Sequence, residues 1–268
     1  MTNPYCKDGK HRLLDSYVVH MDELGTSTAL GDYDDGALQV FLDRTQELRG
    51  ALQWSGLQMD AFSDNVLIGA PLDDPQFDWE EGPHQLFRPV ADHQFKAALQ
   101  GVYIRGALAR GPLYMNSFQV TGRALLTAYT LESRVAQVPR ILATPEAISS
   151  RQVNINAFGG DPLKSPYSRD FAVDEDGWAF INYLHQAAET DDETHRATQL
   201  STHAEHIEHN LKKFVEPSGI REKFVWLAHY HNWVCSTFFN QMGASDILLS
   251  LLLPGERQNP RKFQRLKD

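Results

Sequence analysis

The alternation of strand-like and helix-like segments over the first half of the chain limits its fold more than any other feature. Residues 17–21 are apolar and partly β-branched, which predicts a strand. Residues 37–48 place apolar side chains at helical spacing, which predicts a helix. The segments that follow are predicted as a hairpin, a helix, a strand, a helix and a strand, over 57–70, 90–100, 102–109, 122–136 and 139–144. This order predicts an α/β fold, an α+β sandwich with a mixed or antiparallel sheet.

The predicted hairpin contains polar residues at two points, which leaves its turn either near Asp60 or at Ser63 and Asp64. The stretch after it, residues 71–89, is rich in Pro, Asp, Glu and Gly and has no sustained period. We therefore expect a long acidic surface loop between the hairpin and the next helix.

The character of the sequence changes near residue 152. A stretch rich in Gly, Pro, Ser and Asp runs from 158 to 176, and helical patterns are expected from Trp178 onward, including an amphipathic helix over 224–238. We therefore predict a core over residues 1–152, followed over residues 153–268 by a linker and a helical C-terminal extension.

Composition excludes several classes of partner. With 268 residues, 42% of them hydrophobic, the chain can bury a full core. Its formal net charge of -10, without a long Lys/Arg run, argues against a nucleic-acid partner. The N-terminus lacks an apolar leader and the apolar run over 247–253 is too short to span a bilayer, so no membrane partner is expected. The only cysteines, Cys6 and Cys235, fit a reducing compartment, and we expect a cytoplasmic protein.

Two carboxylates suggest metal chemistry. Asp22 ends the first predicted strand and Asp64 lies in the predicted hairpin, so a sheet can bring them side by side to bridge two divalent cations. Such cations position a triphosphate and stabilise its charge. Either Asp alone has a simpler explanation, because Asp commonly starts a turn by bonding nearby backbone amides. The small-residue turn from Glu23 to Ser27 favours the metal hypothesis, since its amides can cradle phosphate oxygens.

Arg105 lies inside an otherwise apolar predicted strand. A buried arginine requires an anion, which is either a structural carboxylate or a phosphate held by both arms of the guanidinium. The sequence leaves both possibilities open.

Three histidines, His203, His206 and His209, recur at every third position and form one row on a predicted helix. Such a row can bind zinc or nickel. We expect instead a solvated helix face, because the spacing is not that of a known zinc motif. His229 and His231 are expected to belong to helix packing.

Several segments, taken in order, resemble a known family. Residues 17–27 (YVVHMDELGTS) are similar to the first metal-binding strand of class III adenylate and guanylate cyclases, and residues 62–69 (FSDNVLIG) to their second metal-binding hairpin. Residues 105–114 (RGALARGPLY), 120–132 (VTGRALLTAYTLE) and 139–148 (PRILATPEAI) resemble more narrowly the pyrimidine cyclases of the Pycsar antiphage system. The resemblance spans roughly residues 15–150.

The resemblance implies a ferredoxin-type cyclase core that uses two divalent cations, Mn²⁺ or Mg²⁺. It implies Asp22, Glu23 and Asp64 as metal ligands and Arg105 as a catalytic contact to phosphate. The phosphate cradle that it implies is the backbone of Glu23, Leu24, Gly25, Thr26 and Ser27. Related cyclases act as head-to-tail homodimers with active sites at the interface, so a homodimer is implied as well.

The chain departs from the purine cyclases at two points. Where they carry a base-reading Lys four residues before the second metal-binding Asp, this chain has Asp60. Where they carry an Asn and an Arg on the following helix, it has Leu126 and Thr130. Purine recognition is thereby weakened, so the resemblance implies UTP as substrate, with CTP as the alternative and Asp60 near the base. The candidates for transition-state stabilisation are then Arg105, Arg123 and Arg140.

The leading prediction is therefore an enzyme, a uridylate cyclase that forms 3′,5′-cyclic UMP and pyrophosphate as a messenger in antiphage defence. The alternatives are a cytidylate cyclase, an inactive nucleotide-binding module of cyclase-like fold, and a metal-dependent phosphodiesterase or nuclease. The last is disfavoured because such sites need more His and Asp ligands close together, and because an acidic surface repels a polynucleotide.

Overall fold

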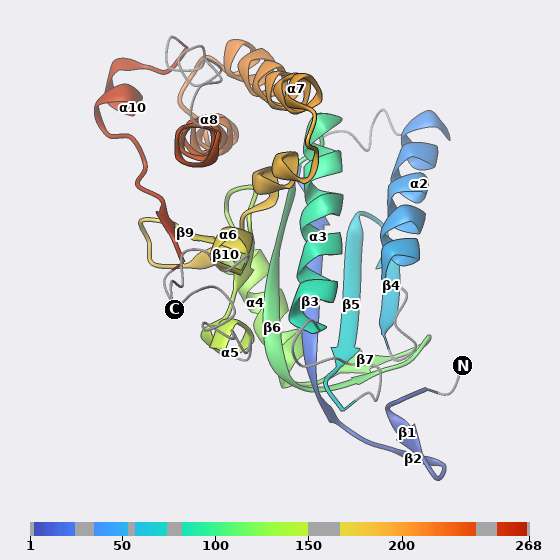
Figure 1. Cartoon of the computed structure of the whole chain (residues 1–268). Helices are drawn as coiled ribbons and strands as arrows, with labels where there is room; N and C mark the ends of the chain where they lie inside the picture. The colour runs from blue at the N-terminus through green and yellow to red at the C-terminus, as the bar shows by residue number, and fades with distance from the viewer. Residues whose placement is uncertain are drawn as a thin grey trace.

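The computed structural model describes residues 3–24, 35–52, 57–73, 82–149, 167–239 and 251–266. A mixed β-sheet runs through the molecule and carries helices on both faces (Figure 1). From one edge to the other, its strands are β4 (Gln58–Phe62), β5 (Asn65–Pro71), β3 (Leu14–Glu23), β6 (Ile104–Met115), β8 (Ile141–Ala143), β10 (Ala179–Ile181), β9 (Phe171–Val173) and β11 (Gln264–Arg265). Strands β6 and β8 pair in parallel, and the other neighbours along this path are antiparallel. The predicted α/β fold with a mixed sheet is confirmed.

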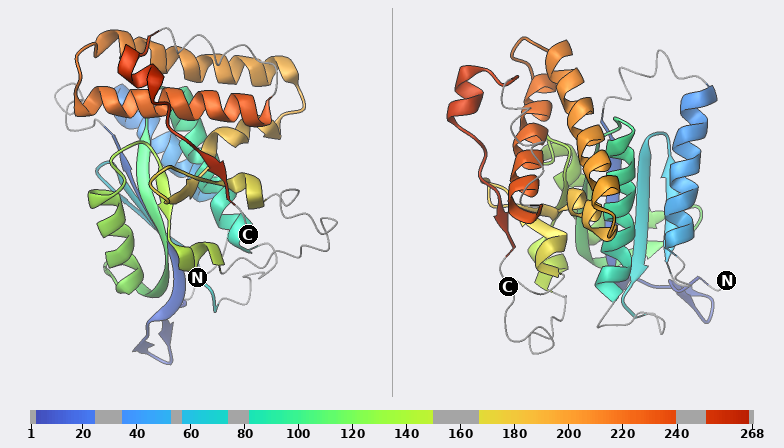
Figure 2. Two further views of the ribbon diagram at one scale, coloured as in Figure 1. Left: turned by 90° about the vertical axis from the view of Figure 1, so that its left-hand side faces the viewer. Right: turned by 45° about the horizontal axis from the view of Figure 1, so that its top comes forward.

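Strand β3 lies at the centre of the sheet, between β5 and β6. Because helices cover both of its faces, nearly all of its side chains are buried, which explains the continuous apolar run at residues 17–21. Helices α2 (Asp35–Ala51) and α3 (Gly82–Leu99) lie on one face, and α4 (Arg123–Arg134) packs against β3 and β6 on the other (Figure 2).

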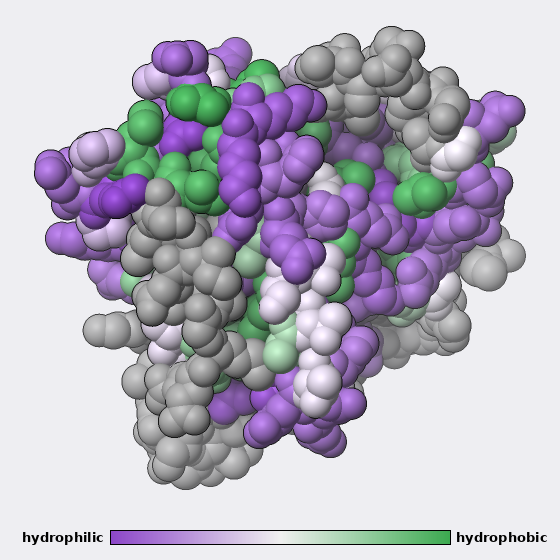
Figure 3. Space-filling view, turned by 90° about the horizontal axis from the view of Figure 1, so that it is seen from above, coloured by the Kyte–Doolittle hydropathy of each residue, from purple (hydrophilic) through white to green (hydrophobic). Residues whose placement is uncertain are grey.

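Two long helices cross the end of the sheet at which β3 finishes and β6 begins (Figures 1 and 2). They are α7 (Glu193–Lys213) and α8 (Gly219–Phe238). Each begins at a side chain that accepts backbone hydrogen bonds, Asp192 for α7 and Ser218 for α8. Seen from above, this end of the molecule presents mostly hydrophilic side chains with apolar groups between them (Figure 3).

The shorter elements complete the fold. They are β1 (Cys6–Lys7), β2 (Lys10–His11), β7 (Val120–Thr121), α5 (Pro145–Ser149), α6 (Tyr167–Asp170), the 3₁₀ helix η4 (Tyr183–Glu189) and α10 (Pro254–Gln258). None of the helices in the described ranges combines the length and hydrophobicity that crossing a bilayer requires.

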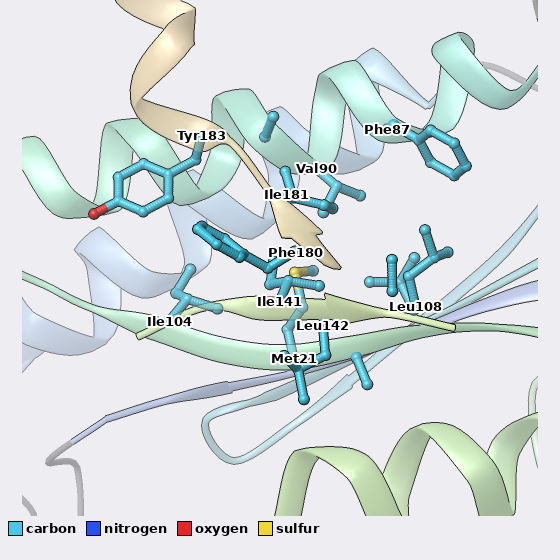
Figure 4. Packing of buried hydrophobic residues seen from close by; sticks show 14 of the residues in the cluster. Met21, Phe87, Val90, Ile104, Leu108, Ile141, Leu142, Phe180, Ile181 and Tyr183 are labelled. Atoms are coloured by element: carbon cyan, nitrogen blue, oxygen red, sulfur yellow. The ribbon is translucent and has the colours of Figure 1, made fainter. Parts of the chain in front are cut away.

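The hydrophobic core joins the two halves of the chain. Phe87 and Val90 of α3, Leu108 of β6 and Phe180 and Ile181 of β10 all belong to one buried cluster (Figure 4). The C-terminal part therefore contributes strands to the central sheet and side chains to the same core as the N-terminal part.

The structure refines several sequence expectations. The hairpin turn is at Ser63 and Asp64, the second of the two predicted positions. Helix α3 begins at Gly82, inside the stretch expected to be a loop, because Pro83 falls in its first turn and Pro89 is accommodated within it. Strand β6 continues to Met115, beyond the predicted end at 109.

The C-terminal prediction was correct for the helices α7 and α8 and wrong near Trp178. Residues 179–181 form β10 instead of a helix, because pairing with β8 and β9 places this short apolar run inside the sheet. The expected boundary near residue 152 lies in the range 150–166, outside the described residues.

Candidate active site

Asp22 occupies the centre of a polar cluster at the end of β3. Its strand neighbours are Asn65 on β5 and Arg105 on β6, each directly opposite it in the register. Residues directly opposite each other in a sheet place their side chains on the same face. The Asp22 side chain is only 16% exposed, so its charge is largely shielded from solvent.

Arg105 divides its guanidinium between two carboxylates. Its Nε donates to Asp22 Oδ2 at 2.9 Å, and its Nη2 lies 2.9 Å from Oε1 of Glu132 on α4. Of the two predicted kinds of partner for Arg105, the structure shows carboxylates. Both arms of the guanidinium are positioned to act together on an anion.

Glu132 is almost fully buried and faces the sheet from α4. Burial raises the pKa of its carboxyl, Arg105 lowers it, and the charges of Asp22 and Asp64 raise it again. The His20 ring lies beside it, with Nδ1 at 3.8 Å from Glu132 Oε2 and without a hydrogen-bond partner. The cluster thus holds several carboxylates close enough to repel one another, which a cation would relieve.

Asp64 lies in the turn that follows β4 and precedes β5. Its backbone carbonyl accepts the Glu23 N–H at 3.2 Å, and its carboxylate accepts the side-chain amide of Asn65 at 3.0 Å. Ser63 adopts a left-handed conformation with φ 55°, which makes the tight turn possible. Since Asn65 lies opposite Asp22, the turn brings Asp64 to the same end of the sheet as Asp22.

Glu23 lies on the other side of the sheet from Asp22. Successive residues of a strand point to opposite faces, and Glu23 is buried against α2, where it forms an ion pair with Arg44. The other arm of Arg44 donates to Gln100 at 2.8 Å. Burial raises the pKa of Glu23, and Arg44 opposes that shift. The charges of Asp64 and Asp22 still raise the pKa of Glu23, although its side chain pairs with Arg44 on the other face of the sheet.

The remaining predicted substrate contacts are more dispersed. The Leu24 backbone N–H donates to the carbonyl of Tyr103 at 2.7 Å, so the start of the predicted phosphate cradle is tied to β6. Gly25, Thr26 and Ser27 lie outside the described residues. Asp60 is exposed on the edge strand β4, where its carboxylate accepts the Ala61 N–H at 3.0 Å.

The arginines proposed for charge stabilisation differ in availability. Arg140 is buried and binds Asp174 and Asp176, which makes it part of the framework. Arg123 is exposed at the start of α4. Arg105 remains as the arginine next to Asp22.

The expectation of a solvated histidine face on α7 was wrong for His203. This side chain is fully buried, its Nε2 is 3.0 Å from the Tyr183 hydroxyl, and its Nδ1 is 3.0 Å from Nδ1 of His231. Burial lowers the pKa of His203, so the ring stays neutral. His206 is half-buried with Nε2 3.1 Å from the Leu99 carbonyl, while His209 is exposed. As expected, His231 belongs to helix packing.

The residues present fit hard divalent cations. Asp22 and Asp64 offer carboxylate oxygens, the ligands that Mg²⁺ and Mn²⁺ prefer. Glu132 Oε1 is buried without a hydrogen bond of good geometry, which leaves acceptor capacity in the cluster. Within the described ranges, however, no three His, Cys, Asp or Glu side chains are arranged as a preformed metal site. Phosphate oxygens would have to complete the coordination.

Sequence reasoning missed Glu132 of the cluster and gave no indication that Lys223 lies nearby. Glu132 could have been found, because it follows Ala128 by four positions and so falls on the buried face of α4. Lys223 of α8 lies close enough for its pKa to respond to Arg105 and Asp22, yet more than one hundred positions separate it from both in the sequence. No local signal relates residues so far apart.

Neither a protein-family model nor a curated protein matches this sequence. Several solved structures are similar to it. The guanylyl cyclase domain of the RhoGC fusion protein from the aquatic fungus Blastocladiella emersonii is 12% identical, with a TM-score of 0.45, covering 63% of this chain and 94% of that one. The guanylate cyclase domain of RhGC from Catenaria anguillulae, solved with GTP, is 11% identical, with a TM-score of 0.45, covering 64% and 98%. An adenylate/guanylate cyclase/hydrolase from Silicibacter pomeroyi is 16% identical, with a TM-score of 0.38, covering 51% and 79%.

Proposed function

We propose that this protein is a nucleotide cyclase that converts UTP into 3′,5′-cyclic UMP and pyrophosphate. The observation that carries the proposal is the cluster at the end of β3, where Asp22 lies beside Arg105 and Glu132, with Asp64 in the adjacent hairpin turn. This arrangement offers oxygen ligands for cations next to a guanidinium that can hold phosphate. The resemblance of residues 15–150 to class III cyclases supports the same conclusion.

Asp22 and Asp64 would hold the divalent cations, Mn²⁺ or Mg²⁺. When bound, such cations promote deprotonation of the attacking hydroxyl and stabilise charge on the leaving group. The ribose 3′-oxygen attacks the α-phosphorus, the new O–P bond forms, and the bond to the bridging oxygen of pyrophosphate breaks. The hydroxyl proton leaves to solvent.

Arg105 has two roles in this scheme. It forms ion pairs with Asp22 and Glu132, which reduces the repulsion between these two carboxylates. If bound cations neutralised Asp22 and Asp64, the arm of Arg105 that contacts Asp22 would be free to contact phosphate oxygens. Glu132 would continue to hold the other arm from α4.

The assignment of a pyrimidine rests on the departures from purine cyclases. Asp60 on β4 is negatively charged where a base-reading Lys is found in them, and Leu126 and Thr130 replace polar residues on α4. CTP is the second candidate on the same grounds. By the Pycsar resemblance, the cyclic product would serve as a messenger in antiphage defence.

A homodimer is part of the proposal. Leu126 and Tyr129 on the outer face of α4 are 66% and 57% exposed, an apolar surface that association with a second copy would cover. The second copy would complete the base pocket and the phosphate site.

The decisive experiment is product identification. Purified protein is incubated with Mn²⁺ and an equimolar mixture of ATP, GTP, CTP and UTP, and products are identified by mass spectrometry. We expect cyclic UMP, and replacement of Asp64 by Asn should lower kcat/KM on the order of a thousandfold, equivalent to ~4 kcal/mol. Asp73→Asn is the matched control, since this carboxylate is 72% exposed and lies just beyond β5.

The outcomes separate the candidate functions. Cyclic CMP as main product would select the cytidylate cyclase. Nucleotide that binds with Mn²⁺ and stays unconverted would select an inactive binding module. Linear monophosphate would indicate hydrolysis and refute the cyclase.

A further inference from the structure

Helix α8 carries one lysine to the end of the sheet where the proposed site lies. Phe224 of α8 packs edge-to-face on Tyr103, with ring centroids 5.6 Å apart. Tyr103 precedes Arg105 by two positions, and its carbonyl accepts the N–H of Leu24, two positions after Asp22. The contact therefore places Lys223, the neighbour of Phe224, next to the strand ends that carry the cluster.

Lys223 also lines a cleft of about 740 Å³. The cleft lies between the first half of α8, the segment 137–138 that leads into β8, and the segment from Glu256 to Arg261. Arg140 follows that first segment, and its carbonyl accepts the N–H of Gly106, the residue after Arg105, at 3.1 Å. Asp22, Arg105 and Glu132 themselves are not among the residues that line the cleft.

Two of the carboxylates that line the cleft are engaged by arginines. Glu256 is bound by Arg221, and Glu175 lies 3.6 Å from Arg261. The Lys223 ammonium is half-buried and forms no ion pair with any residue in the described ranges. A partly exposed ammonium without an ion pair keeps its charge available for an anionic ligand.

The charges near Lys223 also favour an anion at this position. Burial lowers its pKa, the positive charge of Arg105 lowers it further, and Asp22 opposes both effects. The positive charges of Lys223 and Arg105 are therefore close enough to influence each other. A multiply charged anion bound near both would stabilise both.

We propose that Lys223 is a substrate-binding residue that contacts the phosphates of the nucleoside triphosphate together with Arg105. The inference rests on the proposed cyclase function and deepens it. It also gives the C-terminal helix pair a role, because α8 supplies part of the phosphate site. The ligand chemistry is that of a polyphosphate, whose several charges two cations can hold together.

The test compares Lys223→Ala, Lys223→Arg and a control, Lys212→Ala, which removes a lysine that is 61% exposed on α7. Binding of inorganic tripolyphosphate in the presence of Mn²⁺ is measured by titration calorimetry, and KM for UTP is measured in parallel. We expect Lys223→Ala to weaken tripolyphosphate binding at least about tenfold, the loss of one charge-assisted hydrogen bond, and to raise KM correspondingly. The affinity of Lys223→Arg for tripolyphosphate should stay within about threefold of the wild-type value. The affinity of Lys212→Ala should equal the wild-type value.

The two proposals fail in different ways. Wild-type affinity in a folded Lys223→Ala variant would overturn the lysine contact while cyclase activity stands. Tripolyphosphate binding that depends on Lys223, without any cyclic product, would uphold the contact and refute the cyclase. If the wild-type protein does not bind tripolyphosphate, the inference is wrong.

Discussion

Asp174 is the residue whose loss tests how the C-terminal part is attached to the sheet. Its carboxylate is fully buried and accepts hydrogen bonds from Arg140 at 2.5 Å, from Trp226 at 2.8 Å and from Arg261 at 3.0 Å. These donors come from the entry to β8, from α8 and from the C-terminal segment. One carboxylate thus joins segments distant in sequence.

Replacing Asp174 by Asn keeps the shape and removes the charge that two guanidinium groups face. Breaking a buried ion pair from one side costs about 3–5 kcal/mol. Arg140 keeps its contact with Asp176, and Arg261 is 33% exposed, so we expect the lower end, about 3 kcal/mol. With a urea m-value of about 3 kcal/mol/M, the unfolding midpoint should fall by about 1 M.

The assay is urea unfolding followed by circular dichroism and by tryptophan fluorescence. Asp176→Asn is the matched control, because this carboxylate also binds Arg140 but is 37% exposed, and we expect a loss of about 1 kcal/mol or less. If the two variants unfold at the same midpoint, the buried network does not hold the C-terminal part in place. Separate transitions by the two probes would show that the halves unfold independently.

Two further predictions concern stability. Burial lowers the pKa of His231 to about 4, against about 6.5 in the unfolded chain. The unfolding free energy that depends on a neutral His231 is therefore fully present above pH 6.5 and is lost as the pH falls toward 4. At pH 5 the share of the loss that belongs to His231 should be about 2 kcal/mol. It is measured as the difference between wild type and His231→Asn in how far the unfolding free energy changes from pH 7 to pH 5, and an equal change in the two proteins would contradict it. Gly106→Ala should cost about 1–3 kcal/mol in thermal or urea unfolding, because its Cβ would lie 2.3 Å from the backbone oxygen of His20. Gly50→Ala, with open space around its Cβ, should be neutral or stabilising, and equal effects would refute the steric argument.

The helix pair α7 and α8 relates the fold to the proposed chemistry. The buried chain Tyr183, His203 and His231 fixes η4, α7 and α8 to one another through hydrogen bonds. Helix α8 in turn contacts the sheet through Phe224 and Trp226. A rigid α8 would hold Lys223 at a defined place over the strand ends, as substrate binding requires.

Local pattern in the sequence was sufficient for the order of elements and for part of the site. Apolar runs of strand length and helical spacings predict the central strands and the helices α2 and α4, because local periodicity follows from which face is buried. The hairpin after β4 brings Asp64 close to Asp22 through its short turn alone. Side chains alternate between the two faces of a strand, so Glu23 points to the face opposite that of Asp22. The resemblance to metal-binding strands nevertheless implied both residues as metal ligands.

Only the tertiary structure decided which distant side chains complete the cluster. Glu132 reaches Arg105 because α4 packs across β3 and β6. The proposed contact of Lys223 likewise depends on how α8 packs against Tyr103. Contacts of this kind depend on how whole helices and strands pack. The periodicity of a sequence indicates which face of an element is buried, but it does not indicate which other element packs against that face. Asp22, Asp64 and Arg105 could therefore be proposed as site residues from the sequence. The fold was needed to show which buried side chains contact them.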